Sequence, residues 1–257
     1  MRHFFIDQSE LAGPVPALRG ADARHIINVL RLKPGERIGL FDGTGKQYEA
    51  RISDLSSAKV EVFLLGSSDP GVESPLELVV AQSFLKERKM DDLVRQLTEL
   101  GITKWIPFIS ERSIPRPDDK RLAAREKRWN NIAKEAAKQC KRVKITGIGK
   151  TVPFEEVIAF EKDFDLKIVF WENEKNLLDP KSLAADHEDL KKILVMFGPE
   201  GGFSVNEIEK AKESGFITAG IGPRILKAET ATVCACALMQ FLFGDMGKNL
   251  DKDEWLK

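Results

Sequence analysis

The stretch VMFGPEGGFS, residues 195–204, joins the end of an apolar run to a loop that contains three glycines and one proline. A short unbroken apolar run is typical of a strand that is buried on both faces of a parallel sheet. Glycine and proline end such a strand, and Ser204 with Glu207 forms the capping-box signature of a helix that follows. The stretch therefore predicts a strand, a bare loop and a helix in an α/β domain, with the acid Glu200 enclosed among the glycines.

The same alternation of strand and helix continues on both sides of this stretch. Apolar strand patterns begin near residues 76, 104, 166 and 216, and helical patterns lie between them. This order favours a mostly parallel sheet with helices on its faces, in a domain that spans residues 75–257.

Residues 1–70 have a different pattern of apolar and polar residues, typical of β-strands rather than of alternating strands and helices. Alternating apolar and polar residues surround the turn signal Asp42-Gly43-Thr44-Gly45, and residues 59–66 follow as another strand. This order of elements favours a small β-barrel. The stretch GSSDPGVESP, residues 66–75, has the composition of a linker between the two domains.

The composition bounds the class of protein. The chain has 257 residues, 42% of them hydrophobic, and a formal net charge of zero, which favours a globular protein over a disordered one. Its most apolar stretch, Ala231 to Phe243, is shorter than the roughly 20 residues of a membrane span, and the N-terminus lacks a signal-peptide core. We therefore expect a cytoplasmic protein with no membrane partner. The three cysteines and three histidines form no spaced cluster, so we also expect no metal.

Basic residues are concentrated in the middle of the chain. Between Phe84 and Lys150 there are 18 lysines and arginines against 9 acids. A segregated cationic surface attracts polyanions even on a neutral protein, which favours a nucleic-acid partner. An ordinary solvated helix face is the alternative.

Three predicted strand ends carry irregular loops, at residues 172–174, 198–202 and 222–227. Ligands of open parallel sheets bind beyond the carboxyl ends of the strands. Glycines leave backbone amides and carbonyls open to close approach, and such groups suit an adenine or a ribose. The loops lack the Lys-Ser/Thr of a P-loop and the spacing of GxGxxG, so a cofactor without phosphates is favoured and a nucleotide-dependent oxidoreductase is not.

These loops carry a family resemblance. FGPEGGFS (197–204) followed by GIGPRILKAETA (220–231) resembles the paired C-terminal signatures of the SPOUT methyltransferases, and within them the RsmE family, which methylates N3 of a uridine in the decoding region of small-subunit ribosomal RNA. MRHFF, HIINVLRLKPGE, LFDG, QLTELGITKWIPFISERS and RWNNIAKEAAKQCKR resemble the same family, so that nearly the whole chain is covered.

The resemblance implies a fold and partners that the spacing alone does not. It implies an N-terminal PUA-like barrel and a SPOUT-type α/β domain with a deep trefoil knot, a rare exception to the rule that chains are not knotted. It also implies S-adenosylmethionine as the cofactor, 16S ribosomal RNA of the small subunit as the substrate, and a homodimer whose active site draws on both subunits. The chain departs from the family pattern where Lys227-Ala228 replaces the common Arg-Thr, which removes hydrogen-bonding groups near the expected cofactor.

Candidate roles follow for residues of the three loops. We expect the cofactor to bind mainly backbone atoms, with Trp171 or Glu172 near the ribose and Leu226 and Ala228 beside the adenine. The expected backbone contacts are from Phe197, Gly198, Gly201, Ile221, Gly222 and Leu226. We also expect Gly201→Val to block cofactor binding by crowding the loop.

Two residues are candidates for the chemistry. Methyl transfer to N3 requires an unpaired or extruded base and creates a uracil anion, which Arg224 is expected to stabilise. An ion pair of Arg224 with Glu200 or Glu229 that braces the loops is the alternative. Glu200 is expected to cap nearby amides or to face the substrate.

The RNA is expected to bind cations from both domains. The candidates are Arg2, His25, Arg31, Lys86, Arg112, Arg128, Lys138 and Arg142; for each, a solvated charge is the alternative. Two other functions stay open: a SPOUT methyltransferase that acts on another ribosomal or transfer RNA position, and a non-catalytic RNA-binding assembly protein. The second would not need three converging loops.

Overall fold

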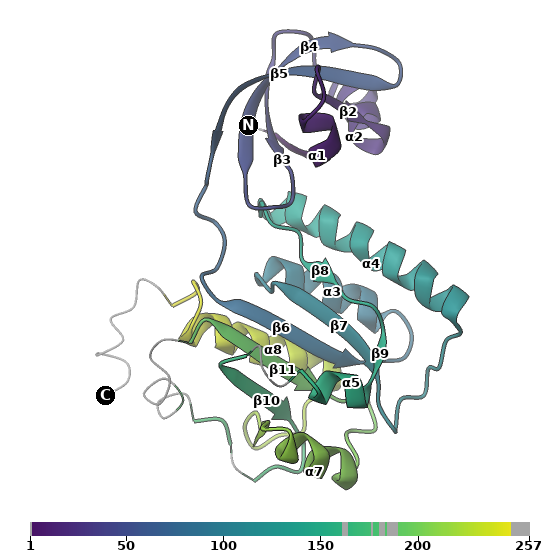
Figure 1. The fold of residues 1–257 in the computed structure, drawn as a ribbon, viewed down its shortest axis with the longest axis vertical. Helices are drawn as coiled ribbons and strands as arrows, with labels where there is room; N and C mark the ends of the chain where they lie inside the picture. Colours follow the sequence, from purple (N-terminus) through teal and green to yellow (C-terminus); the bar gives the residue numbers. More distant parts are fainter. Residues whose placement is uncertain (1, 161–163, 176, 180–182, 184–189, 248–257) are drawn as a thin grey trace. The chain divides into compact units, whose positions relative to one another are not determined.

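The computed structural model describes residues 2–160, 164–175, 177–179, 183 and 190–247 (Figure 1). The chain forms two compact units. Unit 1 contains Met1–Glu73 together with Lys134–Ile145, and unit 2 contains Ser74–Ala133 together with Thr146–Lys257. Among the described residues, no helix combines the length and the apolarity needed to cross a membrane.

Unit 1 is built on a curled sheet. In its described part, five strands follow the order β1-β3-β4-β5-β2, with β1 and β3 parallel and the other neighbours antiparallel. Their bounds are β1 His3–Phe5, β2 Ala17–Arg19, β3 Arg37–Phe41, β4 Gln47–Leu55 and β5 Lys59–Ser68. The short helices α1 (Gln8–Leu11) and α2 (Gly20–Arg24) and the π-helix η1 (His25–Leu30) complete the unit. Its core holds Phe4, Leu18, Ile26, Ile38 and Val62.

The predicted turn between β3 and β4 forms as its sequence indicates. The carboxylate of Asp42 accepts hydrogen bonds from the backbone N–H and the hydroxyl of Thr44, at 2.9 and 2.7 Å. Gly43 and Gly45 both have positive φ, at 82° and 115°, which residues with a side chain rarely adopt. The turn therefore fixes the pairing of the two strands.

Unit 2 is built on a parallel sheet. Within the described residues, seven strands take part, in the order β12-β10-β11-β6-β7-β8, with β9 beside β7, and every pairing is parallel. The bounds are β6 Glu77–Ser83, β7 Lys104–Ile109, β8 Gly147–Ile148, β9 Val152–Pro153, β10 Leu166–Phe170, β11 Lys192–Phe197 and β12 Ile217–Ala219. All five residues of β10 are buried, including Lys167, and the other four are apolar, as expected for a strand covered on both faces. The predicted α/β architecture with a parallel sheet is confirmed.

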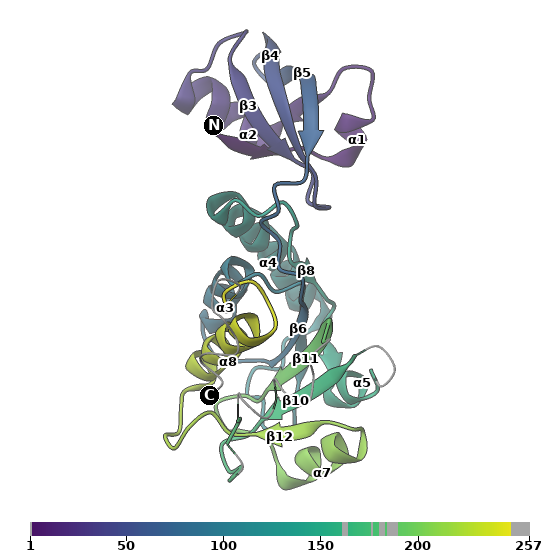
Figure 2. The same ribbon diagram turned by 90° about the vertical axis from the view of Figure 1, so that its left-hand side faces the viewer.

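Helices cover both faces of this sheet (Figure 2). On one side α5 (Phe154–Ile158) and α7 (Val205–Glu213) pack with the sheet residues Val79, Ala81, Leu194 and Met196 into one apolar cluster. On the other side α3 (Lys89–Glu99) contacts α8 (Ala228–Leu242). The long helix α4 (Asp119–Cys140) carries Trp129 and Ala133 inward, as its sequence predicts.

The predicted capping box of α7 is present. The Ser204 hydroxyl accepts from the backbone N–H of Glu207 at 3.2 Å, and the Glu207 carboxylate accepts from the N–H of Ser204 at 2.9 Å. Phe203, the residue before the cap, is buried in the apolar cluster against Phe108 and Phe154. Residues 198–202 are therefore held at both ends, by β11 and by the start of α7.

Candidate active site at the carboxyl edge of the parallel sheet

Three loops meet at one edge of unit 2. Because β12, β10 and β11 are neighbours and run in the same direction, the loops that follow them leave the sheet side by side. They line a cleft of about 810 Å³, together with Lys89 and the first turn of α8. Every loop residue proposed from the sequence lines this cleft: Trp171, Glu172, Phe197, Gly198, Glu200, Gly201, Ile221, Gly222, Arg224, Leu226 and Ala228.

Two features favour glycine at Gly202. Its φ is +65°, and an added Cβ would stand 1.8 Å from Oε1 of Glu172, which belongs to the loop after β10. Gly201 has no such restriction, since a Cβ there would meet only the Arg112 side chain at an ordinary 3.5 Å. The distances to protein atoms therefore give no support for crowding by a Cβ at Gly201, whereas Gly202 is the position at which two loops come close together.

Gly222 leaves its part of the cleft open. Its φ is +71°, and no atom lies within 4 Å of the place where a Cβ would stand. A ligand can therefore approach the backbone here without meeting a side chain.

Arg112 holds the loop after β11. Its guanidinium donates to the carbonyl oxygen of Gly201 at 3.0 Å and to that of Phe203 at 3.3 Å. Arg112, a candidate RNA contact from the sequence, is exposed and also stabilises this loop.

Glu200 and Glu229 share one cation, Lys89. Oε1 of Glu200 accepts from the Lys89 ammonium at 3.0 Å and from the backbone N–H of Lys86 at 3.0 Å. The Lys89 ammonium also lies 3.5 Å from Oε2 of Glu229. Lys89 thus connects the start of α3 to the loop after β11 and to the first turn of α8.

These contacts shift the pKa of both partners of the ion pair. The hydrogen bond to Glu200 raises the pKa of Lys89 above its ordinary value, against the opposing effect of burial. Partial burial acts to raise the pKa of Glu200, but hydrogen bonds from the Lys86 and Glu200 amides and from Lys89 outweigh it and lower that pKa. Both groups are therefore charged at neutral pH.

Arg224 is exposed and lines the cleft from the loop after β12. The acids that were its alternative partners, Glu200 and Glu229, pair with Lys89 instead. Among the described residues, Arg224 has no hydrogen bond or ion pair in this structure. Its charge is available to a ligand.

The proposed RNA-binding cations fall into two groups. Arg2, His25, Arg31 and Lys86 are exposed. Arg128 is exposed too but pairs with Asp91 at 2.6 Å.

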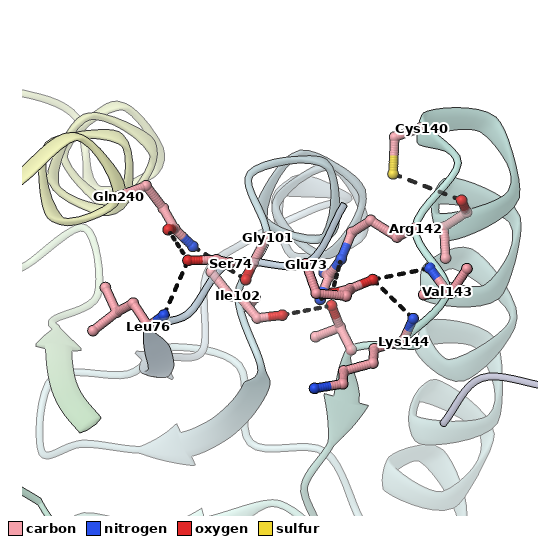
Figure 3. Close-up of polar contacts among 12 residues, drawn as sticks. Glu73, Ser74, Leu76, Gly101, Ile102, Cys140, Arg142, Val143, Lys144 and Gln240 are labelled. Atoms are coloured by element: carbon pink, nitrogen blue, oxygen red, sulfur yellow. Dashed lines mark hydrogen bonds and ion pairs between the residues drawn. The ribbon is translucent and has the colours of Figure 1, made fainter. Parts of the chain in front are cut away.

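Lys138 and Arg142 are not free surface cations, as the count of basic residues had suggested. Lys138 is 13% exposed and lies 2.6 Å from Asp22 and 2.9 Å from Glu135. Arg142 is 6% exposed and donates from Nε and Nη2 to Glu73 at 3.1 and 2.9 Å (Figure 3). All three ion pairs lie within unit 1, and neither Lys138 nor Arg142 belongs to the proposed RNA surface.

Sequence reasoning missed Lys89. It lies in the run LKERKM, where Lys86, Arg88 and Lys89 look equivalent. Only its position at the first residue of α3 distinguishes it. As for metals, the described residues include no group of three or more His, Cys, Asp or Glu that could hold an ion.

Comparison with known proteins agrees with this architecture. Residues 72–240 match the RNA methyltransferase domain family, and residues 18–65 match the RNA methyltransferase PUA domain family. The ribosomal RNA small subunit methyltransferase E of Bacillus subtilis is 30% identical over 247 residues, which cover 94% of this chain and 96% of that protein.

Two solved structures are similar over nearly their whole length. The Neisseria gonorrhoeae ribosomal RNA small subunit methyltransferase E, crystallised with S-adenosyl methionine, is 34% identical with a TM-score of 0.83, over 95% of this chain and 99% of that one. A Legionella pneumophila methyltransferase in complex with the same cofactor is 28% identical with a TM-score of 0.84, over 95% and 98%. This chain therefore belongs to the ribosomal RNA small subunit methyltransferase E family of RNA methyltransferases.

Proposed function

We propose that this protein transfers a methyl group from S-adenosylmethionine to N3 of a uridine in the decoding region of 16S ribosomal RNA. One observation carries the proposal: the three loops predicted from the sequence line a single cleft, in a chain whose relative was crystallised with S-adenosyl methionine. The name of the Bacillus subtilis relative supports the small-subunit RNA as the substrate. N3 of uridine follows from the RsmE resemblance.

The chemistry of the cleft fits this cofactor. Its volume of about 810 Å³ lies in the usual range for small-molecule sites. The proposed backbone donors and acceptors for adenine and ribose are those of Phe197, Gly198, Ile221 and Gly222, and the apolar side chains of Leu226 and Ala228 lie along the same cleft. When bound, the cofactor supplies an electrophilic methyl group for an in-line displacement.

In this proposal Arg224 stabilises the substrate anion. Loss of the N3 proton leaves negative charge on the uracil ring, and a nearby guanidinium lowers the energy of that charge. The lack of a partner for Arg224 among the described residues supports this role. The base must be out of any helix, because N3 lies on its Watson–Crick edge.

Glu200 is a poor proton acceptor in the proposed reaction, because its pKa is lowered and that of Lys89 is raised. A lowered carboxyl pKa means that this ion pair contributes to stability above the ordinary carboxyl pKa and loses that contribution as the pH falls through the lowered value. A raised lysine pKa means that the contribution is lost only at strongly alkaline pH.

Because Glu200 is a poor proton acceptor, we expect Glu200→Gln to leave the dependence of kcat on pH unchanged between about pH 6 and pH 9. A limb of the wild-type profile that vanished in this variant would contradict the assignment and make Glu200 the base.

We propose Arg2, His25, Arg31, Lys86 and Arg128 as the RNA-binding cations. Their exposure supports the proposal. Residues 1–70 would then act as an RNA-binding domain and residues 75–257 as the catalytic domain, in line with the families matched by each part.

The assembly and location are also proposals. A homodimer is supported by the half-exposed apolar side chains of α8, which include Val233, Leu238 and Phe241. The RsmE resemblance further suggests a trefoil knot in the catalytic domain and a cytoplasmic enzyme, where ribosomal RNA is available.

The decisive test is nucleoside mapping of ribosomal RNA. RNA from cells with and without the gene is digested and analysed by mass spectrometry. We expect loss of one N3-methyluridine from 16S RNA, its return with the wild-type gene, and no return with Arg224→Ala. A missing methyl group at another position would indicate a different methyltransferase, and unchanged RNA would favour a non-catalytic assembly protein.

A further inference from the structure

A buried glutamine lies behind the cleft. Gln82, near the end of β6, has no exposed surface and does not line the cleft. Its Nε2 donates to the carbonyl oxygens of Ser83 at 3.1 Å and Gly198 at 3.2 Å, and its Oε1 accepts from the Thr232 hydroxyl at 2.6 Å. A buried amide is costly unless it is hydrogen-bonded, and this one has partners on both of its ends.

The partners of Gln82 belong to two walls of the cleft. Gly198 opens the loop after β11, and Gln82 lies beside it because it pairs in register with Phe197. Thr232 is one turn into α8, whose first turn contributes Ala228 and Glu229 to the cleft, and its hydroxyl also lies 2.9 Å from the Ala228 carbonyl oxygen. The side chain of Gln82 therefore connects the loop after β11 with the start of α8.

The amide of Gln82 offers a donor to one wall and an acceptor to the other. The Gly198 carbonyl can only accept, and the Thr232 hydroxyl has one proton, for which Gln82 Oε1 at 2.6 Å and the Ala228 carbonyl at 2.9 Å are both acceptors. A glutamate would offer only acceptors when ionised and would face the carbonyl oxygens of Ser83 and Gly198. A leucine would offer neither group.

We propose that Gln82 is a positioning residue for the cofactor: it fixes the Gly198 carbonyl and the first turn of α8 at the spacing that the cleft requires. This inference rests on the proposed function, because it concerns the same cleft. Gln82 touches no ligand itself, and it acts through Gly198 and Thr232.

The chain offers a matched control in Gln240. This residue of α8 also has no exposed surface, and its Nε2 donates to the Gly101 carbonyl oxygen at 3.1 Å (Figure 3). Its Oε1 accepts from the Ser74 hydroxyl at 2.7 Å. Gln240 does not line the cleft. Gln240→Glu therefore imposes the same kind of buried carboxylate elsewhere in unit 2.

The test compares Gln82→Glu with Gln240→Glu. S-adenosylmethionine affinity is measured by calorimetry, and hydrogen exchange of residues 197–204 is measured in the protein without ligand. We expect Gln82→Glu to raise the Kd about tenfold or more and to speed exchange in that segment, whereas Gln240→Glu changes the Kd less than about twofold. Equal losses of affinity in both variants would refute the positioning role and indicate general loosening of the core.

Thr232 provides a second pair of variants that does not depend on a buried carboxylate. Thr232→Val removes the hydroxyl at nearly constant shape, and Thr232→Ser restores it. We expect weaker cofactor binding in the first variant and recovery in the second; normal binding in Thr232→Val overturns the proposal even if Gln82→Glu does not fold. A wild-type protein that fails to bind S-adenosylmethionine would instead reject the proposed function.

Discussion

Replacing Gly202 with alanine should weaken S-adenosylmethionine binding about tenfold, because the added Cβ displaces the Glu172 carboxylate and the strained φ shifts the loop that lines the cleft. The φ of +65° places an alanine in the left-handed region, at a cost of about 1–2 kcal/mol. The added Cβ would also stand 1.8 Å from Oε1 and 2.6 Å from Cδ of Glu172, so the Glu172 side chain must leave its place in the cleft. Calorimetry with the purified variant measures the loss of affinity.

Gly201→Ala is the control for this prediction. The residue lies in the same loop, and its φ lies outside the left-handed region that favours glycine. The nearest neighbour of an added Cβ would be the Arg112 Cβ, at an ordinary 3.5 Å. We expect affinity close to that of the wild type. If the two alanine variants bound the cofactor equally well, contact between the loops after β10 and β11 would not matter for the site.

The contrast between these two glycines marks the limit of the sequence pattern. A Gly-Gly pair indicates a bare loop, but it does not say which glycine has positive φ or which one meets another loop. That depends on β10 and β11 being neighbours, with Phe170 opposite Phe197. The loops themselves were predictable, because each follows a strand of a parallel sheet and such strand ends share an edge.

Long-range polar contacts were less predictable. Lys89 reaches Glu200 across 111 positions of the chain, and Gln82 reaches Gly198 across 116. Nothing in the local pattern of either residue reports its partner, since LKERKM reads as a cationic run and LELVVAQSF as a buried strand. The order of the strands determines these pairs, and the strand order is not encoded in any one segment.

The basic segment misplaced two of the candidate RNA-binding cations, Lys138 and Arg142, for a related reason. The count of 18 cations against 9 acids covered Phe84 to Lys150 only. Asp22 pairs with Lys138 and Glu73 pairs with Arg142, and both acids lie upstream of that segment; Glu135, a second partner of Lys138, lies within it. Net charge along the sequence is therefore a poor measure of free charge on the surface.

Arg142→Ala should lower the free energy of unfolding by about 3 kcal/mol, because it leaves a carboxylate without its cation in a nearly buried place. Glu73 is 13% exposed in its side chain, and its Oε2 accepts both bonds from Arg142. Its Oε1 accepts from the backbone N–H of Val143 and Lys144, each at 2.9 Å (Figure 3). These two hydrogen bonds to the carboxylate remain after the substitution and limit the loss of stability. Chemical denaturation followed by fluorescence or circular dichroism measures the loss.

Arg2→Ala separates stability from RNA binding. Its side chain is exposed, so we expect a change in unfolding free energy within about 0.5 kcal/mol, together with weaker binding of small-subunit RNA and a smaller dependence of that binding on salt. Arg142→Ala should show the opposite pattern, with reduced stability and an unchanged salt dependence, because a guanidinium held by Glu73 neutralises no phosphate. A stable Arg142→Ala variant with weakened RNA binding would return this residue to the RNA surface and require Glu73 to release it on binding.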